Sequence, residues 1–312
     1  MSNVYDFPIQ VIDNFEVVLN GENFDSGLHT TIAKDKKVIV RVDDDSNDSR
    51  ILGLVSSDYD VITHKESVEP IENVLRNMYD DSASIPTTIS VQKNGARFRA
   101  VYTLPEQYTI GKDDIVNPTV TVTNSYDGSH GLNIRMGAFR VICSNGQIVG
   151  FADDYSTIHM KGRGIQQYRD DAEPFIKQGI EDVVKECGLW SHWNDTQFNQ
   201  SYSSFEKELV DTFDSYTKDD NNKVPVRRNQ ILNYIAGEMG MQDFHSWMNG
   251  DNFAEPTIWH VYNGLTEYAT KGILNADGFE KKSNTLFSQI PRARLVRNFM
   301  EKNDVFKSNQ IQ

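Results

Sequence analysis

Residues 120–150 most constrain the fold, because apolar and polar residues alternate there between turn sequences. Residues 120–123 have the two-residue period of a strand with one buried face. Residues 124–129 read Asn-Ser-Tyr-Asp-Gly-Ser. Asn and Asp side chains can bond to their own backbone and Gly accepts a left-handed conformation, so this stretch predicts a turn.

The same segment continues with two more strand patterns. Residues 132–136 alternate again, and residues 139–143 form an apolar run after a bend expected at Gly137. Ser144-Asn145-Gly146 is a second tight-turn sequence, and a further apolar run begins at Ile148. The segment therefore predicts an antiparallel meander.

The rest of the chain divides into a strand-rich and a helix-rich part, which is typical of an α+β fold. Strands are expected at residues 15–19, 36–42, 51–55, 59–62, 87–91 and 98–102, and helices at residues 64–79, 173–189, 204–216, 227–239, 257–269 and 292–300. We expect a lead-in over residues 1–30, a strand-rich part over 31–164, a helix-rich part over 165–302 and a flexible tail over 303–312. The sheet, mainly antiparallel and built from the N-terminal half, is expected to pack against the C-terminal helices rather than fold apart from them.

Composition narrows the class of protein. Of 312 residues, 38% are hydrophobic and 24% charged, which is typical of a globular protein. No apolar run has the roughly 18 residues of a membrane helix, and the N-terminus does not resemble a secretory signal. Two cysteines provide neither a disulfide framework nor zinc-binding spacing. We expect a cytoplasmic protein without a cofactor or a membrane partner. The net charge of −14 argues against broad binding to phosphate backbones, although it allows a local basic groove.

The meander contains polar residues that suit a binding groove. One interpretation places Asn124, Asp127, His130, Arg135 and Asn145 around one pocket. The other makes the meander structural, with its Asn and Asp residues serving the turns.

Arginines in the meander have two possible roles. If the apolar residues of 132–136 face the core, the strand period places Arg135 on the opposite, accessible face. The side on which Arg140 lies is less well defined, because it follows Gly137. Both arginines suit phosphate or carboxylate ligands. Alternatively they form ion pairs, for instance with Asp127 or Asp153.

Cations and aromatic residues are interleaved along this part of the chain, a pattern that favours single-stranded nucleic acid. The residues are Arg135, Phe139, Arg140, Lys161, Arg163, Tyr168 and Arg169. Pairing of these cations with the excess of surface carboxylates is the competing interpretation.

The sequence contains few motifs that are typical of enzyme active sites. There is no Gly-x-Ser-x-Gly sequence and no Walker loop, and Cys143 lies in an apolar run, where an inert thiol is usual. His159 with Asp153 and Asp154 does not match a standard metal-ligand spacing. The sequence thus favours a non-enzymatic protein and leaves a metal-dependent enzyme as an alternative.

Three parts of the chain carry a family resemblance. They are residues 38–43 with 52–59, residues 124–129 with 140–146, and residues 257–266. With these segments in this order, the chain resembles a family known from phages and plasmids and catalogued as domain of unknown function 932. The resemblance implies a mobile-element origin and a cytoplasmic setting in a bacterial host, and it implies no reaction.

The first functional hypothesis is binding of single-stranded nucleic acid in phage or plasmid replication or recombination. The second is a host-interaction or anti-defence protein that binds a bacterial protein, because the chain is acidic. The sequence leaves homo-oligomer formation open.

Overall fold

The computed structural model describes residues 4–19, 29–42, 50–79, 85–111, 114–140, 154–157, 165–214, 226–241, 255–274 and 286–309. The chain forms two compact units. Unit 1 comprises Met1–Pro105, Pro118–Gly137 and Ala152–Glu181, and unit 2 comprises Glu106–Asn117, Ala138–Phe151 and Asp182–Gln312. Residues of the expected strand-rich part therefore belong to both units.

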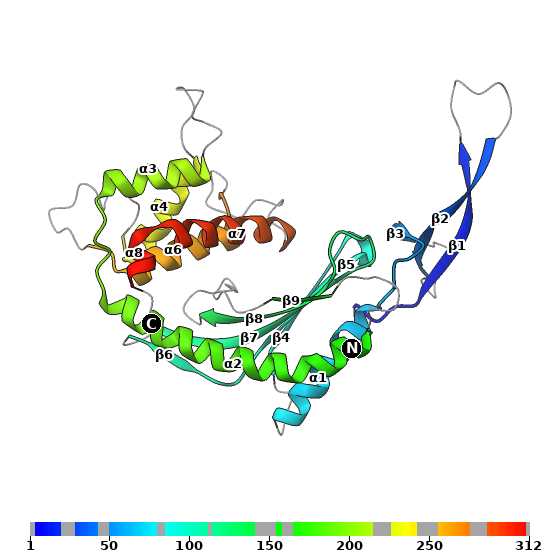
Figure 1. The fold of residues 1–312 in the computed structure, drawn as a ribbon, viewed down its shortest axis with the longest axis horizontal. Helices are drawn as coiled ribbons and strands as arrows, with labels where there is room; N and C mark the ends of the chain where they lie inside the picture. Colours follow the sequence, from blue (N-terminus) through cyan, green and yellow to red (C-terminus); the bar gives the residue numbers. More distant parts are fainter. Residues whose placement is uncertain are drawn as a thin grey trace. The chain divides into compact units, whose positions relative to one another are not determined.

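Two sheets account for the described strands (Figure 1). A three-stranded antiparallel sheet has the order β1-β2-β3, with β1 at Ile9–Leu19, β2 at His29–Arg41 and β3 at Arg50–Ser56. A six-stranded sheet has the order β4-β5-β7-β8-β9, and β6 pairs with β7. Its strands are β4 (Thr87–Gln92), β5 (Arg97–Thr103), β6 (Tyr108–Ile110), β7 (Asp114–Ser125), β8 (Leu132–Arg140) and β9 (Asp154–Thr157).

The helices follow mainly in the second half of the chain, which confirms the α+β class. They are α1 (His64–Met78), α2 (Ile165–Asp195), α3 (Tyr202–Phe213), α4 (Val226–Glu238), α6 (Ile258–Lys271), α7 (Leu286–Lys302) and α8 (Asp304–Ser308). The strands β7 and β8 and the helix α2 each contain residues of both units.

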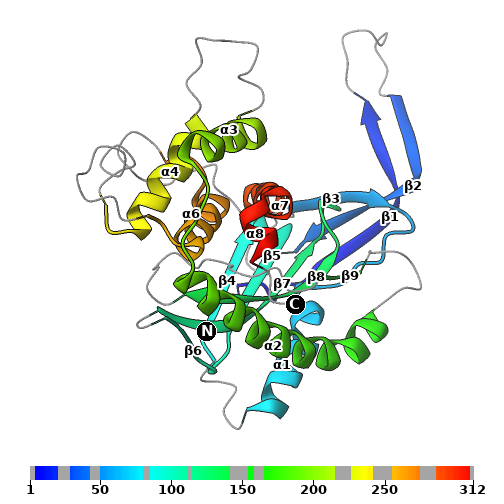
Figure 2. The same cartoon turned by 60° about the vertical axis from the view of Figure 1, so that its left-hand side comes forward.

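The core of unit 1 is formed by side chains that alternate in direction along the strands. Every second residue of β5, β7 and β8 turns to one face of the sheet, and α1 and the first half of α2 cover that face (Figure 1; Figure 2). The strand residues in this core include Phe98, Ala100, Tyr102, Val120, Val122, Leu132, Ile134 and Met136. The helix α2 lies close to β8, because a Cβ atom added to Gly179 would lie 2.1 Å from Met136 Cγ.

The helix α1 confirms the expected helix over residues 64–79. Thr63 and Glu66 form a capping box, in which the Thr63 hydroxyl accepts from the Glu66 amide and the Glu66 carboxylate accepts from the Thr63 amide. Pro70 lies inside this helix, beyond the first turn that suits a proline. Because proline has no N–H, the Glu66 carbonyl loses its usual helical donor there.

The strands β4 and β5 form a hairpin, and the residues of its turn have the backbone angles that such a connection needs. The connection Lys93–Gly95 has positive φ angles at Lys93 and Asn94 (49° and 59°) and at Gly95 (110°). Gln92 pairs with Arg97 directly after this turn. The Asn-Gly sequence explains this connection, because both residues accept positive φ angles more readily than most.

The three-stranded sheet packs one face against residues that border β5 and β7 at one end of the six-stranded sheet, within unit 1. Ile39, Leu52 and Val55 form a core cluster with Ala96 and Tyr126. A Cβ atom on Gly53 would lie 2.1 Å from the Tyr126 carbonyl oxygen, so only glycine allows this approach.

The helices α3 to α8 build a separate core in unit 2. Their buried residues cluster with the second half of α2 and with Ile110, Val116 and Ala138 of β6, β7 and β8. The expected packing of helices on a sheet thus takes two forms: α1 and α2 cover the sheet of unit 1, and the later helices have their own apolar centre.

Four local expectations differ from the structure. Residues 59–62 are not a strand, because Tyr59 instead donates its hydroxyl to the Ser125 carbonyl and Ile62 is buried in the core of unit 1. Gly137 does not interrupt β8, which runs through to Arg140, and residues 120–123 are buried on both faces rather than one. The expected tail contains α8, where Phe306 is buried. The predicted turn at residues 144–146 lies outside the described residues, and so does the acidic sequence at residues 43–48.

Candidate functional site

Asn124 belongs to a buried polar network that fixes the start of α1. The ring Nε2 of His64 lies 2.7 Å from the Gly95 carbonyl oxygen, to which it donates. The ring Nδ1 is therefore an acceptor and lies 3.1 Å from Asn124 Nδ2, which also donates to the Ile62 carbonyl. The side chains of Asn124 and His64 are fully buried, so Asn124 has a structural role.

Asp127 and His130 serve the turn between β7 and β8. Asp127 accepts from Arg97 Nε at 2.7 Å and from the Ser129 amide at 3.1 Å. Burial opposes ionisation of Asp127, but the hydrogen bonds from Ser129 and Arg97 outweigh it and lower its pKa. The His130 Nδ1 lies 2.9 Å from Ser129 Oγ, and the His130 carbonyl accepts from Ser125 Oγ. These contacts agree with the structural interpretation of the turn.

The face of the six-stranded sheet that lies opposite the core of unit 1 is polar. It includes Arg135 and two arginines of β5, Arg97 and Arg99. The strand period places these residues opposite the core of unit 1, and the register aligns those of β5 and β7 across the two strands. On the neighbouring β8, Asn133 donates to Thr123 of β7. We call this surface the polar face: Arg97, Arg99, Thr119, Thr121, Thr123, Asn133 and Arg135. Arg135 thus lies opposite Ile134 and Met136, on the side that the strand period predicts.

Arg99 is the most unusual residue of the polar face. Its side chain is partly buried, and its Nε is buried without a hydrogen-bond partner among the described residues. Burial, followed by the positive charge of the neighbouring Arg135, lowers the pKa of Arg99 to about 10. Arg97 differs, because Asp127 neutralises it. A partly buried cation beside a second cation, with no carboxylate partner among the described residues, is chemically suited to an anionic ligand.

Hydroxyl groups surround this pair of arginines. Arg99 is opposite Thr123 in the register, and Thr121 is two residues away on the same face. The hydroxyls of Thr119 and Thr121 are buried without a hydrogen-bond partner in the part of the chain that the structure describes. Because these hydroxyls are buried, a ligand would contact the partly exposed guanidinium groups of Arg99 and Arg135, which suit phosphate or carboxylate oxygens.

Arg140 belongs to unit 2 and forms a buried ion-pair network. Its Nε lies 2.6 and 2.5 Å from the two carboxylate oxygens of Asp114, and its Nη1 lies 2.5 Å from Glu238 Oε2. Trp259 Nε1 donates to the same Asp114, and the Arg140 guanidinium lies 5.8 Å from the Trp259 ring centroid. Burial disfavours the charge, but Asp114 and Glu238 outweigh it and raise the pKa of Arg140. The structure thus places Arg140 in an ion pair, with carboxylates other than the two considered from sequence.

The remaining predicted site residues do not extend the polar face. Tyr168 is fully buried in the core of unit 1 and donates its hydroxyl to the Ser67 carbonyl, so it cannot stack on a base. Asn145, Lys161 and Arg163 lie outside the described residues. Sequence reasoning missed Arg99, although the alternation of Arg97, Phe98, Arg99 and Ala100 places it opposite the core side chains.

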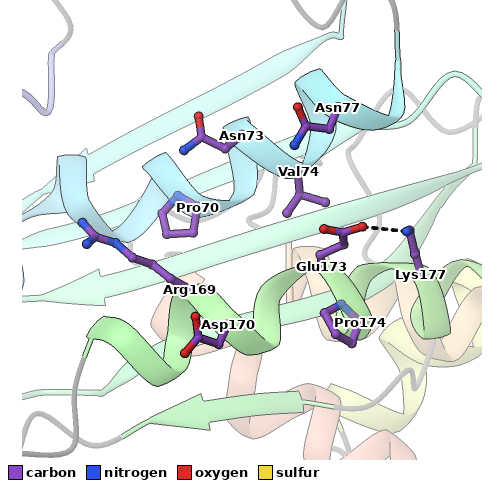
Figure 3. Close-up of a pocket in the computed structure, with 9 residues that line it drawn as sticks. All are labelled: Pro70, Asn73, Val74, Asn77, Arg169, Asp170, Glu173, Pro174 and Lys177. Atoms are coloured by element: carbon purple, nitrogen blue, oxygen red, sulfur yellow. Dashed lines mark hydrogen bonds and ion pairs between the residues drawn. The ribbon is translucent and has the colours of Figure 1, made fainter.

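A groove of 710 Å³ lies between α1 and α2 on the other side of the sheet (Figure 3). It is lined by Pro70, Asn73, Val74, Asn77, Arg169, Asp170, Glu173, Pro174 and Lys177. Both cations of its lining have acidic partners. Lys177 pairs with Glu173 at 2.6 Å, and Arg169 pairs with Glu69 at 3.4 Å. The groove therefore offers less free positive charge than the polar face.

Groups suited to catalysis are few among the described residues. Burial and the nearby Glu186 raise the pKa of the Cys187 thiol to about 12, so this thiol is not a nucleophile near neutral pH. The described ranges contain no group of three His, Cys, Asp or Glu side chains placed to hold a metal ion. Within those ranges, every helix is too short or too polar to cross a membrane.

Comparison with known proteins gives one match. A family model described as a domain of unknown function (DUF932) matches residues 51–304. No curated protein and no solved structure matches the chain. The matched range contains every residue of the polar face.

Proposed function

Because the chain belongs to the DUF932 family, whose description assigns no activity, we propose a function from the polar face itself. The protein binds single-stranded nucleic acid there without catalysing a reaction. The observation that carries this proposal is Arg99, a partly buried cation that lies beside Arg135 and lacks a carboxylate partner among the described residues.

Removing an arginine side chain from water without a counter-charge lowers the stability of the fold, so we expect an interaction that offsets this loss. An uncompensated buried charge destabilises a fold, so side chains of this kind are usually paired. A phosphate group would supply the missing negative charge and accept hydrogen bonds from the guanidinium groups. The polar face is thus suited to a ligand that carries phosphate.

The distribution of charge also favours an anionic ligand. Although the chain has a net charge of −14, the strands β2, β3 and β5 are basic, and Asp35 is their only acidic residue. Their basic residues are Lys34, Lys36, Lys37, Arg41, Arg50, Arg97 and Arg99. The acidic remainder repels a second phosphate backbone, which favours a single strand over a duplex.

Contacts within unit 1 connect this basic region to the polar face. Arg41 lies over the ring of Phe7 at 4.2 Å and donates to the Asn94 carbonyl at 3.4 Å. Next to Asn94, Lys93 approaches Asp127, which pairs with Arg97 on the polar face. A flexible single strand could follow these side chains from β2 to β5.

The test is a fluorescence-anisotropy titration of a labelled oligonucleotide of about 20 nucleotides at several salt concentrations. We expect salt-sensitive binding that Arg99→Met and Arg135→Met weaken. Each lost phosphate contact should reduce the slope of log K against log salt by about 0.7. Arg169→Met is the matched control, because it removes an arginine on the other side of the sheet and should leave binding unchanged.

Circular dichroism separates loss of a contact from loss of the fold. Because Arg99 has no carboxylate partner among the described residues, Arg99→Met should melt at the wild-type temperature or above it. Absence of binding at tens of micromolar protein and low salt would refute the proposal, as would wild-type binding by Arg99→Met. Binding to a basic host protein and metal-dependent catalysis remain predictions from the sequence.

A further inference from the structure

Among the described residues, β1 and β3 are the edge strands of the three-stranded sheet. In the described part of the chain, β2 is the only strand that pairs with β1 or with β3. The strand β1 has 11 residues and β3 has 7, so each presents a row of unpaired backbone N–H and C=O groups. Such edges are templates for pairing with another strand unless charges or prolines block them.

One face of this sheet is apolar and exposed. Ile12 and Leu54 are both opposite Val38 in the register, so these three side chains form a row across the sheet. The exposed fraction is 37% for Ile12, 57% for Leu54 and 72% for Ile51. The other face packs on Ala96 and Tyr126, as described above. Exposed apolar side chains on both edge strands indicate that a partner covers them.

The two edges carry opposite charge. The strand β1 contains Asp13 and Glu16 and no basic residue, whereas β3 contains Arg50 and no acidic residue. Pairing β1 with a second β1 would bring acidic residues together, and pairing β3 with a second β3 would bring arginines together. Pairing β1 with β3 brings unlike charges together, which is favourable between neighbouring strands.

We propose that the partner is a second copy of this chain, whose β1 pairs with β3 of the first copy. Both strands are antiparallel to β2 and hence run in the same direction, so the added strand is parallel to β3 and continues the sheet. The pair then retains one free β1, on the first copy, and one free β3, on the second copy. The contact is heterologous, and its repetition produces a ring or a filament.

The wild-type protein and two edge variants test this arrangement by light scattering after size exclusion, without nucleic acid. Ile12→Lys places a cation on β1, where it faces the basic edge of the next copy. Ile51→Asp places an anion on β3, where it faces the acidic edge. We expect wild-type assemblies larger than a dimer, and a monomer for each variant alone. Ile89→Lys is the matched control on β4, an edge strand of the other sheet, and should assemble like the wild type.

Mixing the two variants distinguishes the proposal from symmetric pairing. The Ile12→Lys chain retains an intact β3 and the Ile51→Asp chain retains an intact β1, so the mixture should form at least a 1:1 pair. A wild-type monomer at the highest soluble concentration would overturn the proposal. Assembly that survives Ile51→Asp, or a mixture that stays monomeric although the wild type assembles, would overturn it equally.

Discussion

Replacing Arg140 by methionine should destabilise unit 2. The substitution keeps much of the apolar stem but removes the charge that neutralises Asp114 and Glu238. The side chains of this network are largely buried, with exposed fractions of 10% for Arg140 and Asp114 and 7% for Glu238. Removing one partner of such a network typically costs about 3–5 kcal/mol, because a buried charge is left without compensation. For a unit of this size, that loss corresponds to a fall in Tm of about 6–20 °C.

The position of the tryptophans provides a selective assay. All four tryptophans, Trp190, Trp193, Trp247 and Trp259, belong to unit 2. Tryptophan fluorescence during urea unfolding therefore reports on unit 2, while circular dichroism follows both units. We expect the fluorescence midpoint of Arg140→Met to fall, with little change in the urea dependence of the unfolding free energy.

A triple variant isolates the cause. Adding Asp114→Asn and Glu238→Gln to Arg140→Met removes the uncompensated charges, and it should restore most of the lost stability. A loss below about 1 kcal/mol in Arg140→Met would refute the reasoning, because that is the value of a solvent-exposed pair. A triple variant no more stable than Arg140→Met would show that packing, rather than charge, is responsible.

Two further predictions concern a helix cap and a close backbone approach. His260 Nδ1 accepts from the Thr257 amide at 3.1 Å in the capping box of α6, and burial, followed by the charge of Arg140, lowers the pKa of His260. A lowered folded pKa means stability that is present above about pH 6.5, the unfolded value, and is lost as the pH falls through the folded pKa. His260→Gln, which can keep the capping box, should lose less tryptophan-detected stability between pH 7.5 and pH 5 than the wild type; an equal loss in both would contradict this role. Gly53→Ala should destabilise unit 1 by about 1–3 kcal/mol in circular-dichroism unfolding, because its Cβ would meet the Tyr126 carbonyl oxygen, whereas the exposed Lys36→Ala should change stability by less than about 0.5 kcal/mol.

Local patterns in the sequence determined most of the elements. The alternation in β5, β7 and β8, the Asn-Gly turn before β5 and the helical period of α1 all depend on residues that are close in sequence, so they predict the α+β class and the sides of the strands. Arg135 is an example, because two-residue alternation alone predicts that its side chain lies on the face of the sheet opposite the core. The same reasoning, applied to β5, would have identified Arg99.

Only the tertiary structure decided which polar residues are neutralised. Asn124 meets His64 from 60 positions away in sequence, and Arg140 meets Glu238 from 98 positions away. Tyr168 follows a helical pattern that fits a groove or a core equally well, and only its contact with Ser67 assigns it to the core. The physical reason is that periodicity indicates the direction of a side chain, whereas the energy of a charge depends on its distance from other charges and on its burial. For this reason the sequence predicted arginines on the meander, and the fold determined that Arg140 is paired while Arg99 lies partly buried beside a second cation.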